Sequence, residues 1–272
     1  MTHRIGLIAG SGPFPVIFSK KAAQKGFQVY AVGFHGETDP ALSGSVEILE
    51  IIHIGQIKRL IRFFKSNRIS EAVMIGAIKK PNSIMDIHPD MKAIAVIAGM
   101  RHNTHDDRIL RAFAKILEDE GIRIRSSTFL IPEFLAPEGC WTKRKPAKEE
   151  LPDVELGWQM AKEIGRLDIG QCVVVSNGSV MAVEAVDGTD STIRRGGKLS
   201  KGHAVVVKVC KPNQDFRFDV PAVGVQTICT MQESGATILA IEARKSLVYD
   251  REEMIRYADA NGISIIALTK EN

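Results

Sequence analysis

The sequence predicts an α/β protein with two domains, an N-terminal Rossmann-like parallel sheet and a C-terminal mixed-sheet α/β domain. In the first half, short apolar runs alternate with segments of helical periodicity, which is typical of a parallel sheet covered by helices. In the second half, strand-like runs follow one another more closely. A charged, Pro-containing segment at 136–152 separates the two patterns, so we expect it to link domains at 1–135 and 153–272.

The first half reads as alternating strands and helices. Apolar runs bounded by Gly or polar residues predict strands at 4–9, 28–33, 71–78 and 123–130. Apolar residues at helical spacing, such as Leu60, Ile61 and Phe64, predict helices at 16–25, 55–67, 92–99 and 107–120.

The second half begins with an expected helix at 154–165 and ends with a helix at 251–261 before a last strand at 263–268. Between them, apolar and β-branched runs predict strands at 171–176, 180–186, 204–209, 224–230 and 237–241. Asn177-Gly178 is a strong signal for a tight hairpin turn, so we expect antiparallel pairing at the start of this domain.

The composition is that of a globular protein, with 44% hydrophobic and 25% charged residues among 272 and a net charge of +4. This mild basic balance favours anionic small molecules or an anionic membrane surface, and it is too dispersed for nucleic acid. We find no signal peptide and no run of about 18 apolar residues. We therefore expect a cytoplasmic protein that can contact the inner membrane peripherally and can form a homodimer.

The glycine-rich turn IGLIAGSGPFP leads from the first strand into the first helix, where backbone N–H groups can bind an anion. Its pattern, with Gly10, Gly12 and Pro15, lacks the third glycine of the dinucleotide-binding fingerprint. Contact with a nucleotide or phosphate is therefore favoured over an NAD site, and a tight turn without a ligand is the alternative.

The segment RHNTHDDR at 101–108 contains two histidines and two aspartates that could ligate a metal. Asp106 and Asp107 also suit the first turn of the following helix, because their charge complements the helix dipole. Capping is the favoured interpretation for at least one of them.

The charged segment EAVDGTDSTIRR follows an apolar run and places Thr189 and Asp190 close to Arg194. Carboxylates bind a hard cation such as Mg²⁺, and arginines bind phosphate oxygens through two parallel hydrogen bonds. A polar turn whose charges pair with each other is the alternative.

A second charged segment, KVCKPNQDFRFDVPAVGVQT at 208–227, lies between two strand-like runs, where ligand-binding loops tend to lie. Its polar candidates are Lys208, Lys211, Gln214, Asp215, Arg217 and Asp219. Two aspartates beside three cations fit a metal-bridged phosphate, and a surface charge cluster is the alternative. The presence of two such segments in one domain strengthens the functional interpretation.

These motifs in combination carry a family resemblance along nearly the whole chain. They are GLIAGSGPFP, IGAIKKP, HDDRILRAF, LDIGQCVVV, AVEAVDGTD and, most specifically, KPNQDFRFDVPAVGVQT. The chain resembles the I-type UDP-2,3-diacylglucosamine pyrophosphatase family of lipid A biosynthesis. The resemblance implies hydrolysis of UDP-2,3-diacylglucosamine to UMP and 2,3-diacylglucosamine 1-phosphate (lipid X), with Mg²⁺ as activator and the substrate between two domains.

The resemblance assigns a role to Asp219 and matches one further motif, and the other candidates come from the glycine turn and the charged segments described above. The essential aspartate of the R-x-D-x-P motif corresponds to Asp219, and the G-T-D segment is matched by 188–190. Asp219 and Asp190 are the catalytic candidates, and Asp219, Asp190 and Asp215 are the metal candidates. The candidates for substrate binding are Gly10, Gly12, Thr189, Arg194, Lys208, Lys211, Gln214, Arg217 and Thr227. The alternatives are a nucleotide-binding oxidoreductase, which the glycine turn would suggest, and a non-catalytic sugar-nucleotide-binding protein.

Overall fold

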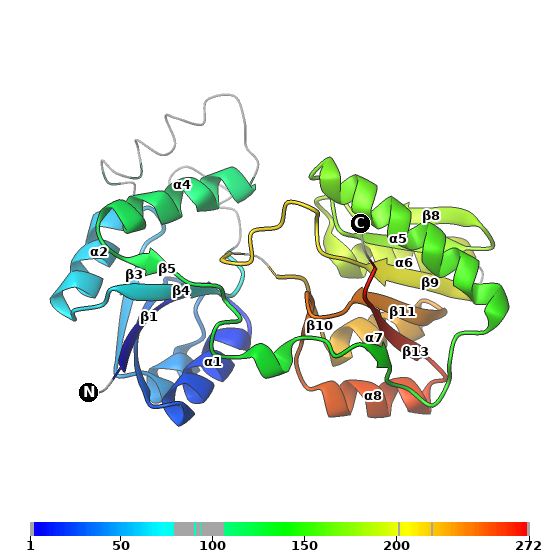
Figure 1. The fold of residues 1–272 in the computed structure, drawn as a ribbon, viewed down its shortest axis with the longest axis horizontal. Helices are drawn as coiled ribbons and strands as arrows, with labels where there is room; N and C mark the ends of the chain where they lie inside the picture. Colours follow the sequence, from blue (N-terminus) through cyan, green and yellow to red (C-terminus); the bar gives the residue numbers. More distant parts are fainter. Residues whose placement is uncertain are drawn as a thin grey trace. The chain divides into compact units, whose positions relative to one another are not determined.

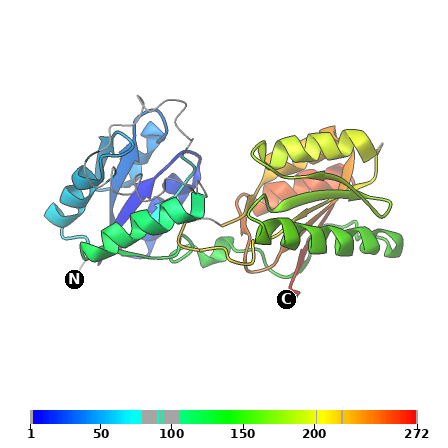
Figure 2. The same ribbon diagram turned by 90° about the horizontal axis from the view of Figure 1, so that it is seen from above.

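The computed structural model describes residues 3–78, 90, 93, 106–200, 202–218 and 220–270, and the chain divides into two compact units. Unit 1 comprises residues 1–132 together with 215–219, and unit 2 comprises 133–214 and 220–272. Both units are α/β, as Figure 1 and Figure 2 show. Unit 1 therefore takes a short piece of chain from the middle of the second half of the sequence.

Unit 1 contains a parallel five-stranded sheet with the strand order β3-β2-β1-β4-β5. Its strands are β1 (His3–Ala9), β2 (Phe27–Phe34), β3 (Ile48–Ile52), β4 (Glu71–Ile75) and β5 (Arg123–Ile124). The chain adds β2 and β3 on one side of β1 and then β4 and β5 on its other side, which is the arrangement of a doubly wound sheet. The predicted parallel sheet is confirmed.

Helices cover both faces of this sheet (Figure 1). They are α1 (Phe14–Gln24), α2 (Ile57–Ser66) and α4 (Asp106–Asp119), with a 3₁₀ turn η1 at Pro40–Ser45. Phe64 of α2 and Leu117 of α4 are buried in one apolar cluster with Ile8 of β1, so both helices cover the same face. Figure 1 shows α1 on the opposite face.

Unit 2 contains a six-stranded mixed sheet with the order β6-β13-β11-β9-β7-β8. Its strands are β6 (Gly139–Cys140), β7 (Cys172–Ser176), β8 (Ser179–Val183), β9 (Ala204–Lys208), β11 (Ala236–Glu242) and β13 (Ser264–Leu268). The central strands β9, β11 and β13 are parallel, whereas β7 is antiparallel to β8 and β9, and β6 is antiparallel to β13. The predicted mixed sheet is confirmed.

Four helices and a small ribbon complete unit 2. The helices are α5 (Leu151–Arg166), α6 (Gly188–Ser200), α7 (Val225–Glu233) and α8 (Arg251–Ala260), and the ribbon pairs β10 (Ala222–Val223) with β12 (Leu247–Val248). Trp158 of α5 packs against one face of the sheet. Ile193 of α6, Met231 of α7 and Met254 of α8 pack against the other. Figure 2 shows α5 and α6 on opposite sides of the sheet.

The hairpin between β7 and β8 forms at the predicted turn. Asn177 and Gly178 have φ angles of 51° and 71°, which a two-residue turn of this hand requires. The turn is fixed from outside as well, because the carboxylate of Asp153 accepts hydrogen bonds from both backbone N–H groups at 2.8 and 2.7 Å.

The strand predicted at 224–230 is wrong, because the structure places helix α7 there. β-Branched residues suggested a strand, but Thr227, Ile228, Thr230 and Met231 are buried, which is a helical spacing. The strand β3 was not predicted, and β5 is far shorter than the predicted strand at 123–130. The helix predicted at 92–99 lies outside the described residues except for Ala93, which is helical.

The segment expected as a linker, 136–152, lies within unit 2. It supplies β6, whose Cys140 pairs with Ile266 of β13, and the 3₁₀ turn η4 (Lys148–Glu150) that leads into α5. Backbone hydrogen bonds thus tie this proline-containing stretch to the sheet edge. Within the described part of the chain, no helix is long and apolar enough to cross a bilayer.

Candidate functional site

The strands β8, β9 and β11 of unit 2 run in the same direction, so their carboxyl ends lie along one edge of the sheet. Glu184 follows β8, Lys208 ends β9 and Glu242 ends β11, and all three side chains are buried. Ligands of open α/β sheets bind at this carboxyl edge. Charged groups buried here need partners, and each of these three has one.

Glu184 organises the beginning of α6. Its Oε1 accepts a hydrogen bond from the Thr189 hydroxyl at 2.7 Å, and its Oε2 accepts one from the Gln171 backbone N–H at 3.0 Å. Thr189 and Asp190 therefore stand in the first turn of a helix, where the positive end of the helix dipole favours a carboxylate or phosphate.

Asp190 is partly exposed, and its carboxylate has no hydrogen-bond or ion-pair partner among the described residues. Its negative charge nevertheless raises the pKa of two neighbouring groups. Burial raises the pKa of the Tyr249 hydroxyl, and the negative charge of Asp190 raises it further. Burial likewise raises the pKa of the Cys172 thiol, with contributions from Glu184 and Asp190. Tyr249 and Cys172 are therefore neutral groups beside an available carboxylate.

Lys208 and Thr227 are both buried near this edge. The Lys208 ammonium donates to the Ala222 carbonyl oxygen at 2.9 Å, and Thr227 lies in the first turn of α7. A Cβ at Gly224, the residue before α7, would lie 2.5 Å from the Tyr249 ring, so glycine is needed there for close packing. The beginning of α7 and the Tyr249 ring are thus in direct contact.

The two arginines after Asp190 lie on α6 rather than in a turn. Arg194 is exposed, whereas Arg195 pairs with Asp187 at 3.0 Å. The Arg195 guanidinium holds the pKa of Asp187 below its usual value. Asp187 and Arg195 therefore pair with each other, as the alternative interpretation of this segment expected.

Lys211 and Gln214 form a compact turn in unit 2. The Lys211 ammonium donates to Asp168 Oδ1 at 2.6 Å, and its backbone N–H donates to Gln214 Oε1 at 3.0 Å. The Gln214 backbone N–H donates to the Lys211 carbonyl at 3.0 Å. These contacts give both predicted binding residues a structural role in shaping the turn.

The glycine turn of unit 1 is closed by the main chain. The Gly10 N–H donates to the Ile75 carbonyl at 2.8 Å, and Ser11 and Ala77 exchange backbone hydrogen bonds of 2.7 and 3.2 Å. A Cβ at Gly10 would lie 2.4 Å from the Ala77 oxygen, whereas Gly12 has open space and a φ of 91°. Close approach of two chain segments therefore requires Gly10 irrespective of any ligand.

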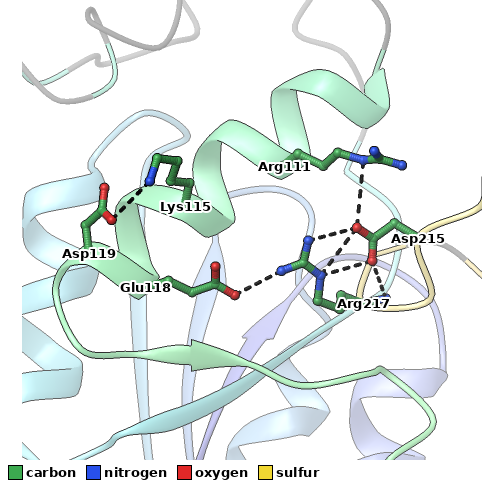
Figure 3. Close-up of polar contacts among 6 residues, drawn as sticks. All are labelled: Arg111, Lys115, Glu118, Asp119, Asp215 and Arg217. Carbon is green, nitrogen blue, oxygen red and sulfur yellow. Dashed lines mark hydrogen bonds and ion pairs between the residues drawn. The ribbon is translucent and has the colours of Figure 1, made fainter.

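Asp215 and Arg217 lie in unit 1, where they form a network with helix α4 (Figure 3). Arg217 donates from Nε to Asp215 Oδ1 at 3.0 Å and from Nη2 to Oδ2 at 2.8 Å. Its Nη1 donates to Glu118 Oε1 at 2.9 Å, and Arg111 Nε lies 3.7 Å from Asp215 Oδ2. The Arg217 guanidinium holds the pKa of Asp215 below its usual value, which keeps the carboxylate charged.

Some predicted residues lie outside the part of the chain that the structure describes. Asp219 is one, as are His102 and His105, and the side chains of Asp106 and Asp107 are not described either. Among the described residues, no group of three or more His, Cys, Asp or Glu side chains is placed to hold a metal ion.

The structure thus groups the predicted residues in separate places. Thr189, Asp190, Lys208 and Thr227 belong to the carboxyl edge of unit 2, and Asp215 and Arg217 belong to the α4 network of unit 1. The prediction missed Glu118, Glu184 and Tyr249. Tyr249-Asp250, directly before a predicted helix, gave a weak signal for Tyr249, while Glu118 is 99 residues from its partner and gave none.

The fold and this charged sheet edge define a two-unit α/β protein with a candidate site for an anionic ligand. Family models match nearly the whole chain: the LpxI N-terminal domain covers residues 4–134 and the LpxI C-terminal domain covers 137–266. The chain therefore belongs to the LpxI family. It is 30% identical to the UDP-2,3-diacylglucosamine pyrophosphatase LpxI of Caulobacter vibrioides, over 98% of this chain and 98% of that protein.

Solved structures give weaker matches. The biotin carboxylase domain of Hydrogenobacter thermophilus 2-oxoglutarate carboxylase is 15% identical, with a TM-score of 0.28. That match covers 66% of this chain and 36% of the other. N5-carboxyaminoimidazole ribonucleotide synthetase of Thermotoga maritima is 13% identical over 68% of this chain and 42% of the other, with a TM-score of 0.25. Likeness at this level carries no functional argument.

Proposed function

We propose that this protein hydrolyses the pyrophosphate bond of UDP-2,3-diacylglucosamine to give UMP and 2,3-diacylglucosamine 1-phosphate. The observation that carries the proposal is the 30% identity, over nearly the full length of both chains, to the Caulobacter pyrophosphatase. Membership of the LpxI family through both domains supports the same reaction. A lipid-bearing substrate also gives a reason for peripheral contact with the inner membrane.

The carboxyl edge of unit 2 suits part of this chemistry. A pyrophosphate resists attack because its negative charge repels a nucleophile, so the enzyme must neutralise that charge and stabilise the leaving phosphate. We assign the first turns of α6 and α7, with the hydroxyl of Thr227, to phosphate binding. Asp219, matched to the essential aspartate of the family motif, is assigned to positioning or deprotonating the attacking water.

Of the two described carboxylates predicted as metal ligands, Asp190 fits Mg²⁺ and Asp215 does not. Magnesium is commonly held by one or two carboxylates together with substrate phosphates and water. Asp190 suits this role because no described residue occupies its carboxylate, whereas Asp215 is occupied by Arg217. We propose that Asp190 holds Mg²⁺, which would supply positive charge to the pyrophosphate.

An assay of UMP release tests the proposed function. The purified protein should release UMP from UDP-2,3-diacylglucosamine, and EDTA should abolish the release until excess Mg²⁺ is added. UDP-glucosamine without acyl chains should be turned over more slowly. No UMP release in the presence of Mg²⁺ would refute the hydrolase, and release that resists EDTA would refute the metal requirement.

A further inference from the structure

The five residues 215–219 belong to unit 1, although the chain before and after them belongs to unit 2. The fold of unit 1 therefore includes a segment that the sequence places about one hundred residues away from α4. Such a distant contact carries a cost in loop-closure entropy, so specific interactions must hold it. Three kinds of interaction do so.

The backbone and an aromatic ring provide two of them. The Phe216 carbonyl oxygen accepts hydrogen bonds from the Ser127 N–H and the Ser126 hydroxyl, both at 3.2 Å. The Phe218 ring packs against the apolar cluster that contains Phe64 and Leu117. These contacts attach the segment to the strand and helix core of unit 1.

The third interaction is the charged network on α4 (Figure 3). Arg217 binds Asp215 within the segment and Glu118 on the helix, and its guanidinium lies 4.8 Å from the centre of the Phe218 ring. The Asp215 contact is internal to the segment. On α4, Glu118 is the partner that binds the guanidinium itself, whereas Arg111 lies 3.7 Å from Asp215.

We infer that Glu118 is a positioning residue for the reaction, acting through Arg217 on residues 215–218, which precede Asp219 in the chain. The inference rests on the proposed function, in which Asp219 is catalytic. Asp219 follows Phe218 directly in the chain. A catalytic group displaced by about 1 Å loses much of its effect on rate, while substrate binding is retained. Arg217 accordingly serves as the anchor of the segment rather than as a phosphate ligand.

The solvent exposure of the Arg217–Glu118 ion pair distinguishes a positioning role from a role in global stability. The side chains of Arg217 and Glu118 are 34% and 39% exposed, and ion pairs at such exposure contribute little to global stability. Loss of Glu118 should therefore change turnover without unfolding the protein. A residue that acted on stability alone would change the melting temperature instead.

Asp119 provides a matched control, because it is the next acid on the same helix and pairs with Lys115 instead (Figure 3). Glu118→Gln should lower kcat by about tenfold, with KM changed less than about twofold. Asp119→Asn should leave both constants near the wild-type values. Glu118→Asp, which retains the carboxylate, should recover part of the lost turnover.

Hydrogen exchange at the backbone amides of 216–218 provides a readout that does not depend on activity. Exchange there should be faster in Glu118→Gln than in Asp119→Asn, with melting temperatures of the two variants within about 2 °C. Equal exchange and equal kcat in the two variants would overturn the inference, as would a loss of kcat that follows a lower melting temperature. If the wild-type protein releases no UMP, the proposed function fails, and the exchange comparison still decides whether Glu118 holds the segment.

Discussion

The two sheets end differently at their carboxyl edges. In unit 1 the turn after β1 is closed by backbone hydrogen bonds between Ser11 and Ala77, and Gly10 is required by packing. In unit 2 the corresponding edge is lined by charged and hydroxyl side chains, with Asp190 available in the first turn of α6. The carboxyl ends of the strands are therefore closed by main-chain hydrogen bonds in unit 1, whereas in unit 2 they carry side chains that can bind a ligand.

Replacement of Asp219 by Ala should have the largest effect on activity. Loss of a water-positioning or metal-binding carboxylate is expected to lower kcat by about 10²–10⁴-fold. Circular dichroism and the melting temperature should stay close to those of the wild type, and substrate should still bind in an equilibrium assay. Near-normal UMP release by this variant, or inactivity caused by unfolding, would contradict the assignment.

Glu242 tests whether the charges at the unit 2 edge also support the fold. Its Oε2 accepts from the Lys162 ammonium at 2.7 Å and from the Cys210 N–H at 2.9 Å, and its Oε1 accepts from Lys245 at 2.9 Å. Glu242→Gln should reduce the free energy of unfolding by about 3 kcal/mol, because it leaves the largely buried ammonium of Lys162 without a counter-charge. Glu163→Gln, which alters an exposed pair with Arg166, is the control and should change stability very little.

The same carboxylate predicts a pH dependence of stability. Burial alone would raise the pKa of Glu242, but Lys162, Lys245 and the Cys210 N–H outweigh it and lower the pKa below its usual value. Its stabilisation is therefore present above the unfolded-state pKa of about 4.3 and is lost as the pH falls through the lower folded-state pKa. Urea unfolding below that value should show a smaller difference between wild type and Glu242→Gln than at pH 7; an unchanged difference would contradict the ion-pair explanation.

Asp190→Asn sharpens the comparison of the two edges directly. If this carboxylate holds Mg²⁺, its loss should lower kcat by up to about 10²-fold and raise the Mg²⁺ concentration needed for half-maximal activity. Asp187→Asn, three residues earlier and paired with Arg195, should retain the metal dependence of the wild type. An identical Mg²⁺ titration for Asp190→Asn and the wild type would exclude Asp190 as a ligand.

Gly10→Ala should have the smallest effect of this series, and it acts on unit 1. The added Cβ would meet the Ala77 oxygen at 2.4 Å, so the junction between the turns after β1 and β4 must open. Such overpacking costs about 2 kcal/mol of stability. Gly44→Ala, where a Cβ has open space, should leave the melting temperature unchanged. Equal melting temperatures for both variants would show that the junction yields easily.

Local patterns made the architecture predictable, and distance in sequence limited the rest. Helix α2 and strand β4 were readable because Leu60, Ile61 and Phe64 repeat at helical spacing and because the apolar strand is continuous. Helix α7 was misread because its β-branched residues favour a strand, while tertiary packing decides in favour of the helix. The Arg217 pairing with Glu118 was inaccessible, since no local pattern reports which of several exposed acids on α4 will meet a distant arginine.

Unit 1 cannot be completed during synthesis until residues 215–219 have been added, long after residues 1–132. Residues 215–219 leave the ribosome more than eighty residues after Pro132, so for that interval the surface that later receives Phe218 has no ring to cover it. A fragment ending at Pro132 would keep this surface permanently uncovered and should therefore be prone to self-association. A peptide spanning residues 213–220, supplied separately, should bind to such a fragment and reduce its aggregation.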